Sequence, residues 1–532
     1  MPPRVPLYRV PARQPNPEKP RSYGRLGEIP TLLPGSITPS AIYHNPVLSD
    51  AKGQDHGDPF VMEYLGSYYL YHTGREGVRL YTSSDLVSWH YQGIVLGPEP
   101  GHWAEIDFWA PEVMYHEGVF YMYVAATRRK EDGKGDDKLR RLGVARALRP
   151  EGPFVWNPEP IVGWEWSIDG HPYRDEDGSL WFFYNIRTEA TRYHDGTIGC
   201  GNVVSRMISP EEVERTQHPV AYPSHRWEGN RRGNWYWNEG PCVLKRRGIY
   251  FQMYSGGCYA DDTYGLGFTT ASTPQGPWHK QSRVPILKSS KAILGPGHHS
   301  IVTGPDGVTP YVVYHGYLPG TRGRKVHLDR IFWAGDRPVV EGPTRTQQPR
   351  PRGPVYDPRV PHYNFSAWVF GRQVRIGGVP LLLSGSGYQH LRVIRRDLPS
   401  NGPMAVSWLK VYLNGVVKFD GAVTKASPSA ELEVDGEIHH PLQTSWLDDE
   451  QIYPLSAGEK QAWMWGGSGD LEVSLAVHGH ALIRVDEEEF EVNHERYELI
   501  RLWIEGGANG LEVEGLGRGA SVTDVVMTAR SL

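Results

Sequence analysis

The sequence predicts an all-β protein in which a five-bladed β-propeller is followed by a C-terminal β-sandwich. Three observations predict this. The 532 residues include 61 Gly, 44 Pro, 30 Tyr and 18 Trp, a composition typical of short strands joined by tight turns. A unit of strand, turn and strand recurs at a spacing of roughly 55 to 70 residues, which suits propeller blades. The last part of the chain alternates apolar and polar residues, as half-buried antiparallel strands do.

Residues 1–40 contain proline throughout. Proline removes a backbone donor and fixes φ, so we expect an extended N-terminal segment without regular structure. No apolar leader core follows Met1, and no apolar run approaches the length of roughly 18 residues that spans a membrane. We therefore expect a soluble, cytoplasmic protein, or a secreted one if a leader has been removed.

The segment from His56 to Gly74 carries the repeated unit in its clearest form. Asp58 opens a short apolar strand, a turn at Gly66 follows, and a second strand is rich in Tyr, which together predict a β-hairpin. Further copies run to about residue 340, and we therefore assign residues 41–340 to the propeller. The opening residues of the other copies are Pro111 with Glu112, Asp169, Glu239 and His298.

Residues 341–362 have the composition of a linker, rich in Pro, Arg and Gly. In residues 363–532, the segment Leu471–Val477 alternates strictly, and Val411–Val417 carries an Asn-Gly turn between apolar residues. These patterns predict an antiparallel β-sandwich domain. This domain would shape a pocket on the propeller or bind sugar itself.

The charge and the cysteines exclude several classes of protein. A net charge of -5 argues against nucleic acid as a partner. Three cysteines are too few, and odd in number, for a disulfide framework, so we expect buried or free thiols. Their spacing matches no metal site.

Three acidic residues open separate copies of the repeat. The first strand of each blade lines the central channel of a propeller, so Asp58, Asp169 and Glu239 should meet near one end of the axis. A single Asp before Pro or Gly is most often a turn residue. Three carboxylates at matching points favour a catalytic site instead. Nearby negative charges raise the pKa of one carboxyl group, so that one carboxyl can act as an acid while another stays ionised and can act as a base.

Aromatic residues gather just upstream of the same strands. Each one alone could simply pack between blades. Their shared placement favours aromatic faces in a pocket, which suit the C–H faces of sugars. Carboxylates with aromatic residues therefore indicate carbohydrate, and two carboxylates are what glycoside hydrolysis requires. These aromatic residues are Trp103, Phe108, Trp109, Trp164, Trp166, Trp235, Tyr236 and Trp237.

A set of motifs in residues 41–340 closely resembles glycoside hydrolase family 43. The resemblance implies a five-bladed propeller that hydrolyses pentose-containing saccharides with inversion. It implies that Asp58 is the general base, that Glu239 is the general acid, and that Asp169 tunes the acid's pKa and holds it in place. The motifs are Gly57-Asp58-Pro59, Ser83 to Trp89, Phe108 to Val113, Ile168-Asp169-Gly170, Glu239-Gly240-Pro241 and Gly295 to His298.

The resemblance also implies roles outside the acidic residues. His298 matches a histidine near the propeller axis that is linked to a bound cation or water, so a water-mediated structural Ca²⁺ is an open expectation, with no cofactor required. Arg324 matches an arginine that contacts substrate, although Arg322 and Lys325 beside it also suit a solvated loop. Trp109 is the leading substrate-facing aromatic residue, with Trp166 and Phe108 as further candidates.

The sequence predicts an exo-acting enzyme that releases a terminal pentose, and among pentoses we favour α-L-arabinofuranose. A β-D-xylosidase or a galactofuranosidase on the same scaffold is the alternative. A non-catalytic carbohydrate-binding propeller is the alternative from another class, although acids at matched positions speak against it. A WD-repeat scaffold is disfavoured because the blades lack a Gly-His to Trp-Asp signature. The expected partner is an arabinose- or xylose-containing carbohydrate, with no nucleic acid and no membrane, and the oligomeric state stays open.

Overall fold

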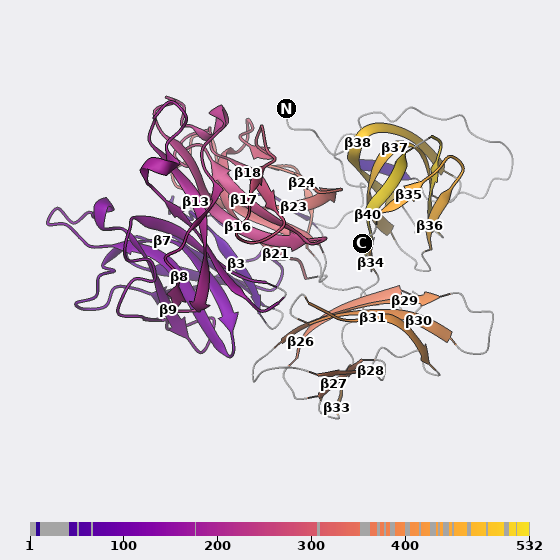
Figure 1. Ribbon diagram of the computed structural model, residues 1–532, viewed down its shortest axis with the longest axis horizontal. Coiled ribbons are helices and arrows are strands. Elements are labelled where there is room, and N and C mark those ends of the chain that lie inside the picture. Colours follow the sequence, from indigo (N-terminus) through magenta and orange to yellow (C-terminus); the bar gives the residue numbers. More distant parts are fainter. Residues whose placement is uncertain are drawn as a thin grey trace.

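The computed structural model describes a chain that is built of β-strands, with single-turn 3-10 helices as the helical elements of the described residues (Figure 1). These short helices are η2 (Asp137–Leu139), η3 (Glu189–Thr191) and η4 (Arg226–Glu228). No helix in the described part of the chain is long and apolar enough to cross a membrane. The all-β prediction is confirmed. The described residues are 7–10, 42–49, 53–64, 67–175, 177–305, 309–351, strand segments between 362 and 449, 452–464, 470–485, 488–504, 510–517 and 519–530.

The predicted hairpin that begins after Asp58 opens the first antiparallel sheet. Phe60 pairs with Tyr71 and Tyr71 with Leu80, so the Tyr-rich strand is the second of four. The sheet consists of β3 (Phe60–Tyr64), β4 (Ser67–His72), β5 (Val78–Ser83) and β6 (His90–Leu96).

Four more groups of mainly antiparallel strands follow in chain order, of which the third and fourth are joined into one ten-stranded sheet by a short parallel pairing at Gly199–Cys200 and Tyr236–Trp237. The second group is β7 (Ile106–His116), β8 (Val119–Thr127), β9 (Arg141–Ala147) and β10 (Val155–Trp156). The third is β11 (Ser167–Arg174), β12 (Leu180–Ile186) and β13 (Gly199–Ser209), with the short β14 (Glu212–Val213) and β15 (His218–Ala221). The fourth is β16 (Tyr236–Arg246), β17 (Ile249–Gly256) and β18 (Gly265–Ala271), with β19 (His279–Lys280) and β20 (Leu287–Lys288). The fifth is β21 (Leu294–Thr303), β22 (Pro310–Tyr317), β23 (Lys325–Ala334) and β24 (Arg337–Val340).

The first strands of successive groups lie against one another, and β21 of the fifth group lies against β3 of the first. Ser300 links these two strands, because its hydroxyl accepts from the Val61 N–H at 3.1 Å and donates to the Pro59 carbonyl at 3.2 Å. The chain before the first group is also tied to the fifth group, since β2 (Ile42–Tyr43) pairs with β25 (Gln348–Pro349). Both ends of this region are therefore held together.

Apolar cores lie between neighbouring groups of strands. Phe108 and Phe120 of the second group pack with Tyr71 of the first, and all three are essentially buried. A similar cluster joins Tyr123 of the second group to Phe182 of the third. Burial of large aromatic and branched side chains on both faces stabilises each sheet against its neighbours.

The C-terminal part of the chain is antiparallel, as predicted, but its strands are arranged in three sheets. The Asn-Gly hairpin is confirmed, since Leu413 pairs with Val416. Two four-stranded sheets contain β26 (His362–Val369), β29 (Gln389–Leu398), β30 (Ala405–Leu413) and β31 (Val416–Lys425), and β28 (Val379–Leu382), β27 (Gln373–Ile376), β32 (Leu432–Val434) and β33 (Glu437–His439). An eight-stranded sheet contains β1 (Leu7–Val10), β34 (Trp446–Asp449), β35 (Tyr453–Leu455), β36 (Lys460–Met464), β37 (Asp470–Val485), β38 (Glu488–Ile504), β39 (Gly510–Gly515) and β40 (Ala520–Arg530).

The prediction that residues 1–40 lack regular structure is wrong at Leu7–Val10. This segment pairs in parallel with Arg501–Ile504 of β38, so the N-terminus adds an edge strand to the C-terminal sheet. Prolines flank the segment but do not interrupt it, and its four residues keep their backbone donors. The other residues of 1–40 lie outside the described residues.

Buried ion pairs join the eight-stranded sheet to the fourth and fifth groups. Glu472 of β37 accepts from Arg330 at 2.5 Å and from Arg501 at 2.6 Å, and all three side chains are nearly buried. Asp524 of β40 pairs with Arg246 and also accepts from the Gly335 N–H at 2.9 Å. In this junction each buried charge is therefore compensated by an oppositely charged partner, and loss of one partner would leave the other buried without compensation.

Candidate active site

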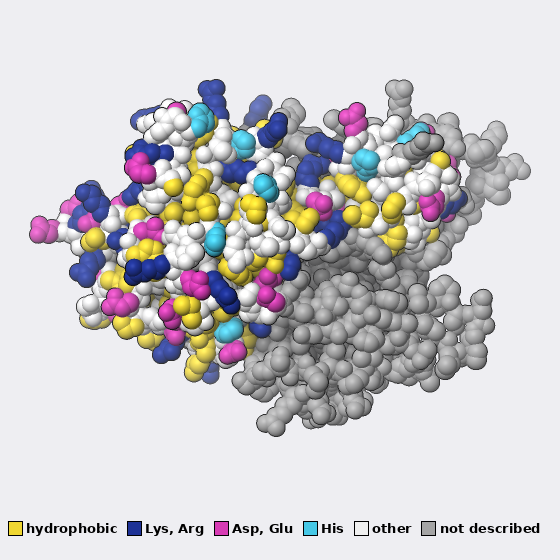
Figure 2. Space-filling model, viewed as in Figure 1, with side chains coloured by type: hydrophobic (Ala, Val, Ile, Leu, Met, Phe, Trp, Pro, Cys, Tyr) yellow, Lys and Arg dark blue, Asp and Glu magenta, His cyan; other side chains and the backbone are white. Residues whose placement is uncertain are grey.

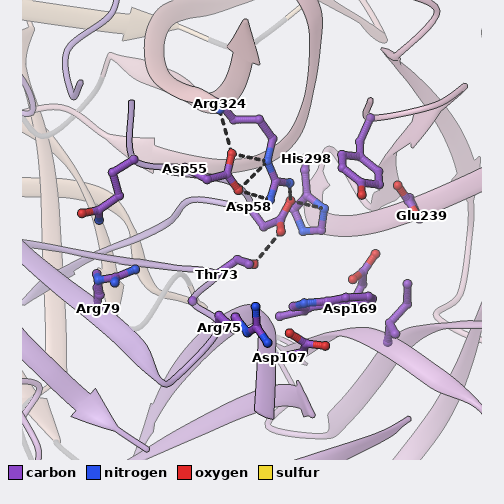
Figure 3. Close-up of a pocket in the computed structure, with 15 residues that line it drawn as sticks. Asp55, Asp58, Thr73, Arg75, Arg79, Asp107, Asp169, Glu239, His298 and Arg324 are labelled. Atoms are coloured by element: carbon purple, nitrogen blue, oxygen red, sulfur yellow. Dashed lines mark hydrogen bonds and ion pairs between the residues drawn. The ribbon is translucent and has the colours of Figure 1, made fainter. Parts of the chain in front are cut away.

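A pocket of about 350 Å³ opens where the first strands of the groups meet (Figure 3). The three acidic residues that the sequence singled out all line it, and so do Trp109, His298 and Arg324. The lining residues that the sequence analysis did not name are Gln54, Asp55, Thr73, Arg75, Arg79, Asp107 and Tyr259, while Gly74 and Ile168 were named within the repeat and a motif.

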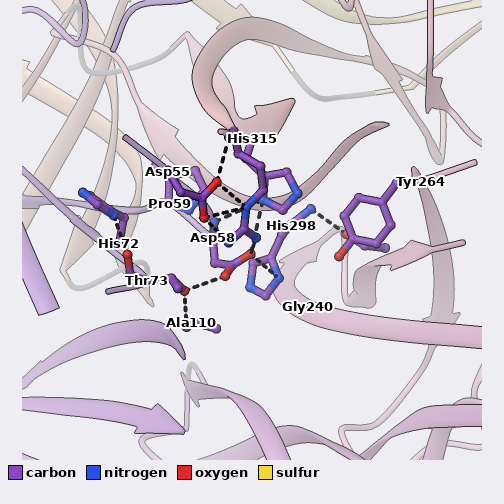
Figure 4. A network of polar contacts seen from close by, with 12 residues as sticks. Asp55, Asp58, Pro59, His72, Thr73, Ala110, Gly240, Tyr264, His298 and His315 are labelled. Atoms are coloured by element: carbon purple, nitrogen blue, oxygen red, sulfur yellow. Dashed lines mark hydrogen bonds and ion pairs between the residues drawn. The ribbon is translucent and has the colours of Figure 1, made fainter. Parts of the chain in front are cut away.

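Asp58 stands just before β3, with a left-handed backbone at φ 56°. Its Oδ1 accepts from Arg324 Nη1 at 2.7 Å, and its Oδ2 accepts from the Thr73 hydroxyl at 2.5 Å. Two histidines also approach Oδ1, with Nδ1 of His298 at 3.4 Å and Nδ1 of His315 at 3.2 Å (Figure 4). Burial favours the neutral acid, but Arg324 and the histidines prevail and hold the pKa of Asp58 well below its usual range. Asp58 is therefore a carboxylate at neutral pH.

Asp55 positions the arginine that acts on Asp58. The Arg324 backbone N–H and Nε donate to Asp55 Oδ1 at 2.7 and 3.1 Å, and Nη2 donates to Asp55 Oδ2 at 2.6 Å. Gly57 leaves room for the guanidinium, since a Cβ at this residue would lie 1.8 Å from Arg324 Cζ. Arg324 is thus buried and clamped between two carboxylates, which excludes the solvated-loop alternative.

Glu239 and Asp169 differ from Asp58 in protonation. Burial raises the pKa of Glu239 to about 7, partly offset by the Tyr264 hydroxyl, which donates to Oε1 at 2.7 Å. Burial also raises the pKa of Asp169 to about 7, with His298 opposing and Glu239 adding to the shift. Oδ2 of Asp169 accepts from the Gly240 N–H at 3.0 Å, which fixes the backbone next to Glu239. Of the three acidic residues that the sequence singled out, one is therefore ionised and two titrate near neutrality.

The structure corrects the alignment of the five copies. A residue with positive φ lies just before the first strand of the first group and within the first strand of each of the others, and a register shift accompanies it in β7, β11, β16 and β21. These residues are Asp58, Ala110, Asp169, Gly240 and His298. Glu239 therefore precedes its matching position by one residue, and the second group contributes Ala110 rather than Pro111 with Glu112. Glu112 lies instead in a buried pair with Nδ1 of His171 at 2.6 Å.

Trp109 is the predicted aromatic residue that lines the pocket. The Arg140 guanidinium lies 3.3 Å from its ring centroid and covers one face. Phe108 was predicted to contact substrate, but its side chain is fully buried and packs in the core near Trp156. Successive residues of a strand point to opposite faces, so only one of these two neighbours can reach the pocket. Trp166 lies outside the pocket lining, with the Arg187 guanidinium 4.4 Å from its ring centroid.

A metal at His298 stays a prediction. Among the described residues, no group of three or more His, Cys, Asp or Glu side chains could hold a metal ion. The His298 backbone N–H donates to the Ser255 hydroxyl at 2.8 Å, and its ring lies against Gly240 and near Asp58. The protein thus offers no direct ligand set there, and any cation would be held through water. The three cysteines are free, as predicted.

Thr73, His315 and Tyr264 are the contacts of the acidic residues that sequence reasoning missed. Thr73 follows the Tyr-rich strand of the opening hairpin and also accepts from the Ala110 N–H at 2.9 Å. Its position at the end of that strand, beside Asp58, was the available signal. Tyr264 gives no such signal, because it lies outside every motif and only the folding of β17 and β18 brings it to Glu239.

The comparisons with known proteins agree with this geometry. The family model "Glycosyl hydrolases family 43" matches residues 43–338. The chain belongs to glycoside hydrolase family 43. The crystal structure of a thermostable family-43 glycoside hydrolase is 36% identical, with a TM-score of 0.53 over 58% of this chain and 99% of that one. The protein is therefore a glycoside hydrolase, as the sequence predicted.

Curated relatives of the family-43 chain carry different activities in their names. A β-D-galactofuranosidase of Aspergillus niger is 28% identical over 52% of this chain and 79% of its own length. An extracellular exo-α-(1→5)-L-arabinofuranosidase of Streptomyces avermitilis is 24% identical over 59% of this chain and 67% of its own. A putative β-xylosidase of Xylanibacter ruminicola is 26% identical over 50% of this chain and 45% of its own. The family is thus established, while these names differ in the sugar released.

Proposed function

We propose that this family-43 hydrolase releases a terminal pentose, α-L-arabinofuranose in the first place, from an oligo- or polysaccharide with inversion at the anomeric carbon. The observation that carries the proposal is the division of protonation within one pocket. Asp58 is held ionised by Arg324, while burial raises the pKa of Glu239 to about 7. An acid and a base on the same substrate are what inverting hydrolysis requires.

In this mechanism Glu239 donates its proton to the glycosidic oxygen as the bond to the leaving group breaks. Asp58 takes a proton from a water molecule that attacks the anomeric carbon from the opposite face. Arg324 keeps Asp58 ionised before the reaction. Asp169 holds the backbone at Gly240, and when ionised it adds to the burial and to the charge of Asp58 that raise the pKa of Glu239.

We assign the remaining pocket residues to binding. Trp109 offers an aromatic face to the sugar ring, while His298 and Arg324 offer donors to its hydroxyl groups. We further propose that the five strand groups close into a propeller. The contact of β21 with β3 and the Ser300 hydrogen bonds support closure.

A β-D-xylosidase or galactofuranosidase activity is the second candidate, and the names of the relatives favour keeping it. A carbohydrate partner fits the surface, since Figure 2 shows positive and negative side chains interspersed on the described part of the visible face rather than a basic patch. Relatives named extracellular favour secretion over the cytoplasmic location that the sequence suggested.

Nitrophenyl α-L-arabinofuranoside, β-D-xyloside and β-D-galactofuranoside, assayed with wild type, Glu239→Gln and Asp58→Asn, test the proposal. We expect the arabinofuranoside to be cleaved fastest and both variants to lose at least about a thousandfold in kcat. Proton NMR during the first turnovers should show the sugar released with inverted anomeric configuration. Binding without hydrolysis by wild type would identify a lectin, and retained configuration would overturn the mechanism.

A further inference from the structure

The charges around the pocket are matched except at one place. Asp55 and Asp58 share Arg324, at 2.6 and 2.7 Å. Asp107 lies 3.6 Å from Arg140. The side chain of Arg79, which also lines the pocket, forms no ion pair, hydrogen bond or ring contact with any part of the chain that the structure describes.

Arg79 is held in the pocket by its strand. It belongs to β5, where its backbone pairs with His72 on one side and with Ile94 on the other. Gly74 is its neighbour in the lining, since a Cβ on Gly74 would lie 3.6 Å from Arg79 Nη1, within ordinary van der Waals contact. The side chain is half-buried, and Figure 3 shows it across the pocket from Glu239, on the same side as Arg75.

A half-buried guanidinium loses hydration, and this loss is compensated when a carboxylate accepts from its planar fork. The described residues supply none for Arg79. Arg75, its cationic neighbour in the lining, has Glu76 at 3.6 Å, but Glu76 is already bound by Arg129 at 2.7 Å. The part of the lining that contains Arg75 and Arg79 therefore offers positive charge to a ligand in the pocket.

We propose that Arg79 binds a carboxylate of the substrate, so that the protein acts on acidic saccharides of the uronic acid class. This inference rests on the proposed function. Glu239 would protonate the leaving group, and Arg79 lies across the pocket from it, so the carboxylate belongs to the released sugar or to a substituent on it. A hexuronic acid in pyranose form is a pentopyranose with a carboxylate on C5, so it presents the same ring hydroxyl groups as the xylose of the second candidate function. For an arabinofuranose, the carboxylate would instead belong to a uronic acid substituent.

The test compares acids with their methyl esters, which keep the size and lose the charge. One pair is a nitrophenyl hexuronide and its methyl ester, and the other is a pentose oligosaccharide that carries a uronic acid on its terminal pentose, with its ester. For wild type we expect kcat/KM to favour the acid about tenfold in one of the pairs, which also locates the carboxylate. The preference should fall as salt is raised.

Variants assign this preference to Arg79. Arg79→Gln should remove the tenfold ratio of acid to ester, and Arg79→Lys should keep part of it, because it retains charge but not the fork. Arg206→Gln, at an exposed position on β13, should leave the ratio as in wild type. Equal rates for acid and ester in wild type, or an unchanged ratio in Arg79→Gln, would overturn the inference while pentoside hydrolysis still supports the proposed function. If no glycoside is cleaved, the proposed function fails, and calorimetric binding of the same acids and esters decides on Arg79 separately.

Discussion

At the scale of single residues, the protonation of Glu239 depends on one hydroxyl. Tyr264 donates to Glu239 Oε1 and stabilises the charged form, so it lowers a pKa that burial raises to about 7. A general acid is active while protonated, and hence kcat/KM should fall as pH rises through about 7. On the acid side, activity should persist until Asp58 is protonated, well below the usual pKa of Asp.

Tyr264→Phe should therefore move the alkaline limb of the pH profile to higher pH. Removing the donor leaves the Glu239 carboxylate less stabilised, which raises the pKa further. The measurement is kcat/KM against pH for wild type and variant. Tyr254→Phe is the matched control, since that buried hydroxyl donates to Glu228 at 2.8 Å, a residue that does not line the pocket. A limb that stays in place or moves to lower pH in Tyr264→Phe would contradict this role.

Gly57 has a steric role, since it leaves room for the guanidinium of Arg324. A Cβ there would collide with the guanidinium of Arg324, so Gly57→Ala should displace that group from Asp58. Misplacement by about 1 Å at a reacting centre costs about a hundredfold in rate, and we expect a kcat/KM loss of that order in a folded protein. Gly97→Ala is the control, because its Cβ would meet only the Glu76 carbonyl at 3.7 Å. Equal activity of the two variants would show that Arg324 is not needed where it lies.

At the scale of elements, the same device is repeated in the first strands. A residue with positive φ and a change in register turns the backbone at the pocket, and Gly is suited to this conformation while Asp and His pay a cost in strain. In β16, the first strand of the fourth group, Gly240 takes the position with positive φ. Glu239, the residue before it, reaches the pocket. Three of the four non-glycine residues of this set, Asp58, Asp169 and His298, line the pocket, and Ala110 is the exception.

The junction between β23 and β37 gives a prediction at the element scale. Glu472→Gln removes one of the two carboxylates that Arg330 and Arg501 share, and leaves these buried cations with Glu341 as their remaining charged partner. We expect a loss of about 3 to 5 kcal/mol in the free energy of unfolding, measured by denaturant titration. Glu489→Gln, which breaks a partly exposed pair with Arg484 at 2.6 Å, should cost about 1 kcal/mol or less. Similar losses in both variants would contradict a structural role for the buried pair.

At the scale of the whole molecule, the C-terminal sheet is part of the fold around the pocket. It supplies Glu472 and Asp524 to arginines of the fourth and fifth groups, and it takes a strand from the N-terminus. The sheet is therefore coupled to residues 42–351 through these buried charges.

A protein that ends at residue 351 should consequently be far less stable than the full chain. Arg246 and Arg330 would lose their buried carboxylates, and apolar surface of β23 and β24 would be exposed. We expect a melting temperature lower by about 10 °C or more, or insoluble expression, with pentoside hydrolysis tested on any soluble fraction. A truncated protein as stable as the full chain would show that the junction contributes nothing.

The sequence by itself determined the all-β class, the family and three acidic residues of the pocket. Strand alternation, the repeat and the motifs are local signals, and each is carried by residues that are near one another in the chain. The sequence did not show that Glu239 lies one residue before the position equivalent to Asp58 and Asp169. It also did not show which of Phe108 and Trp109 faces the pocket. Both depend on where each strand bends, which changes the strand register and the face to which each side chain points. Only the tertiary structure decided protonation, since Asp58 and Arg324 are 266 residues apart in sequence and meet at 2.7 Å. A pKa depends on burial and on neighbouring charges, and both exist only once distant strands have packed.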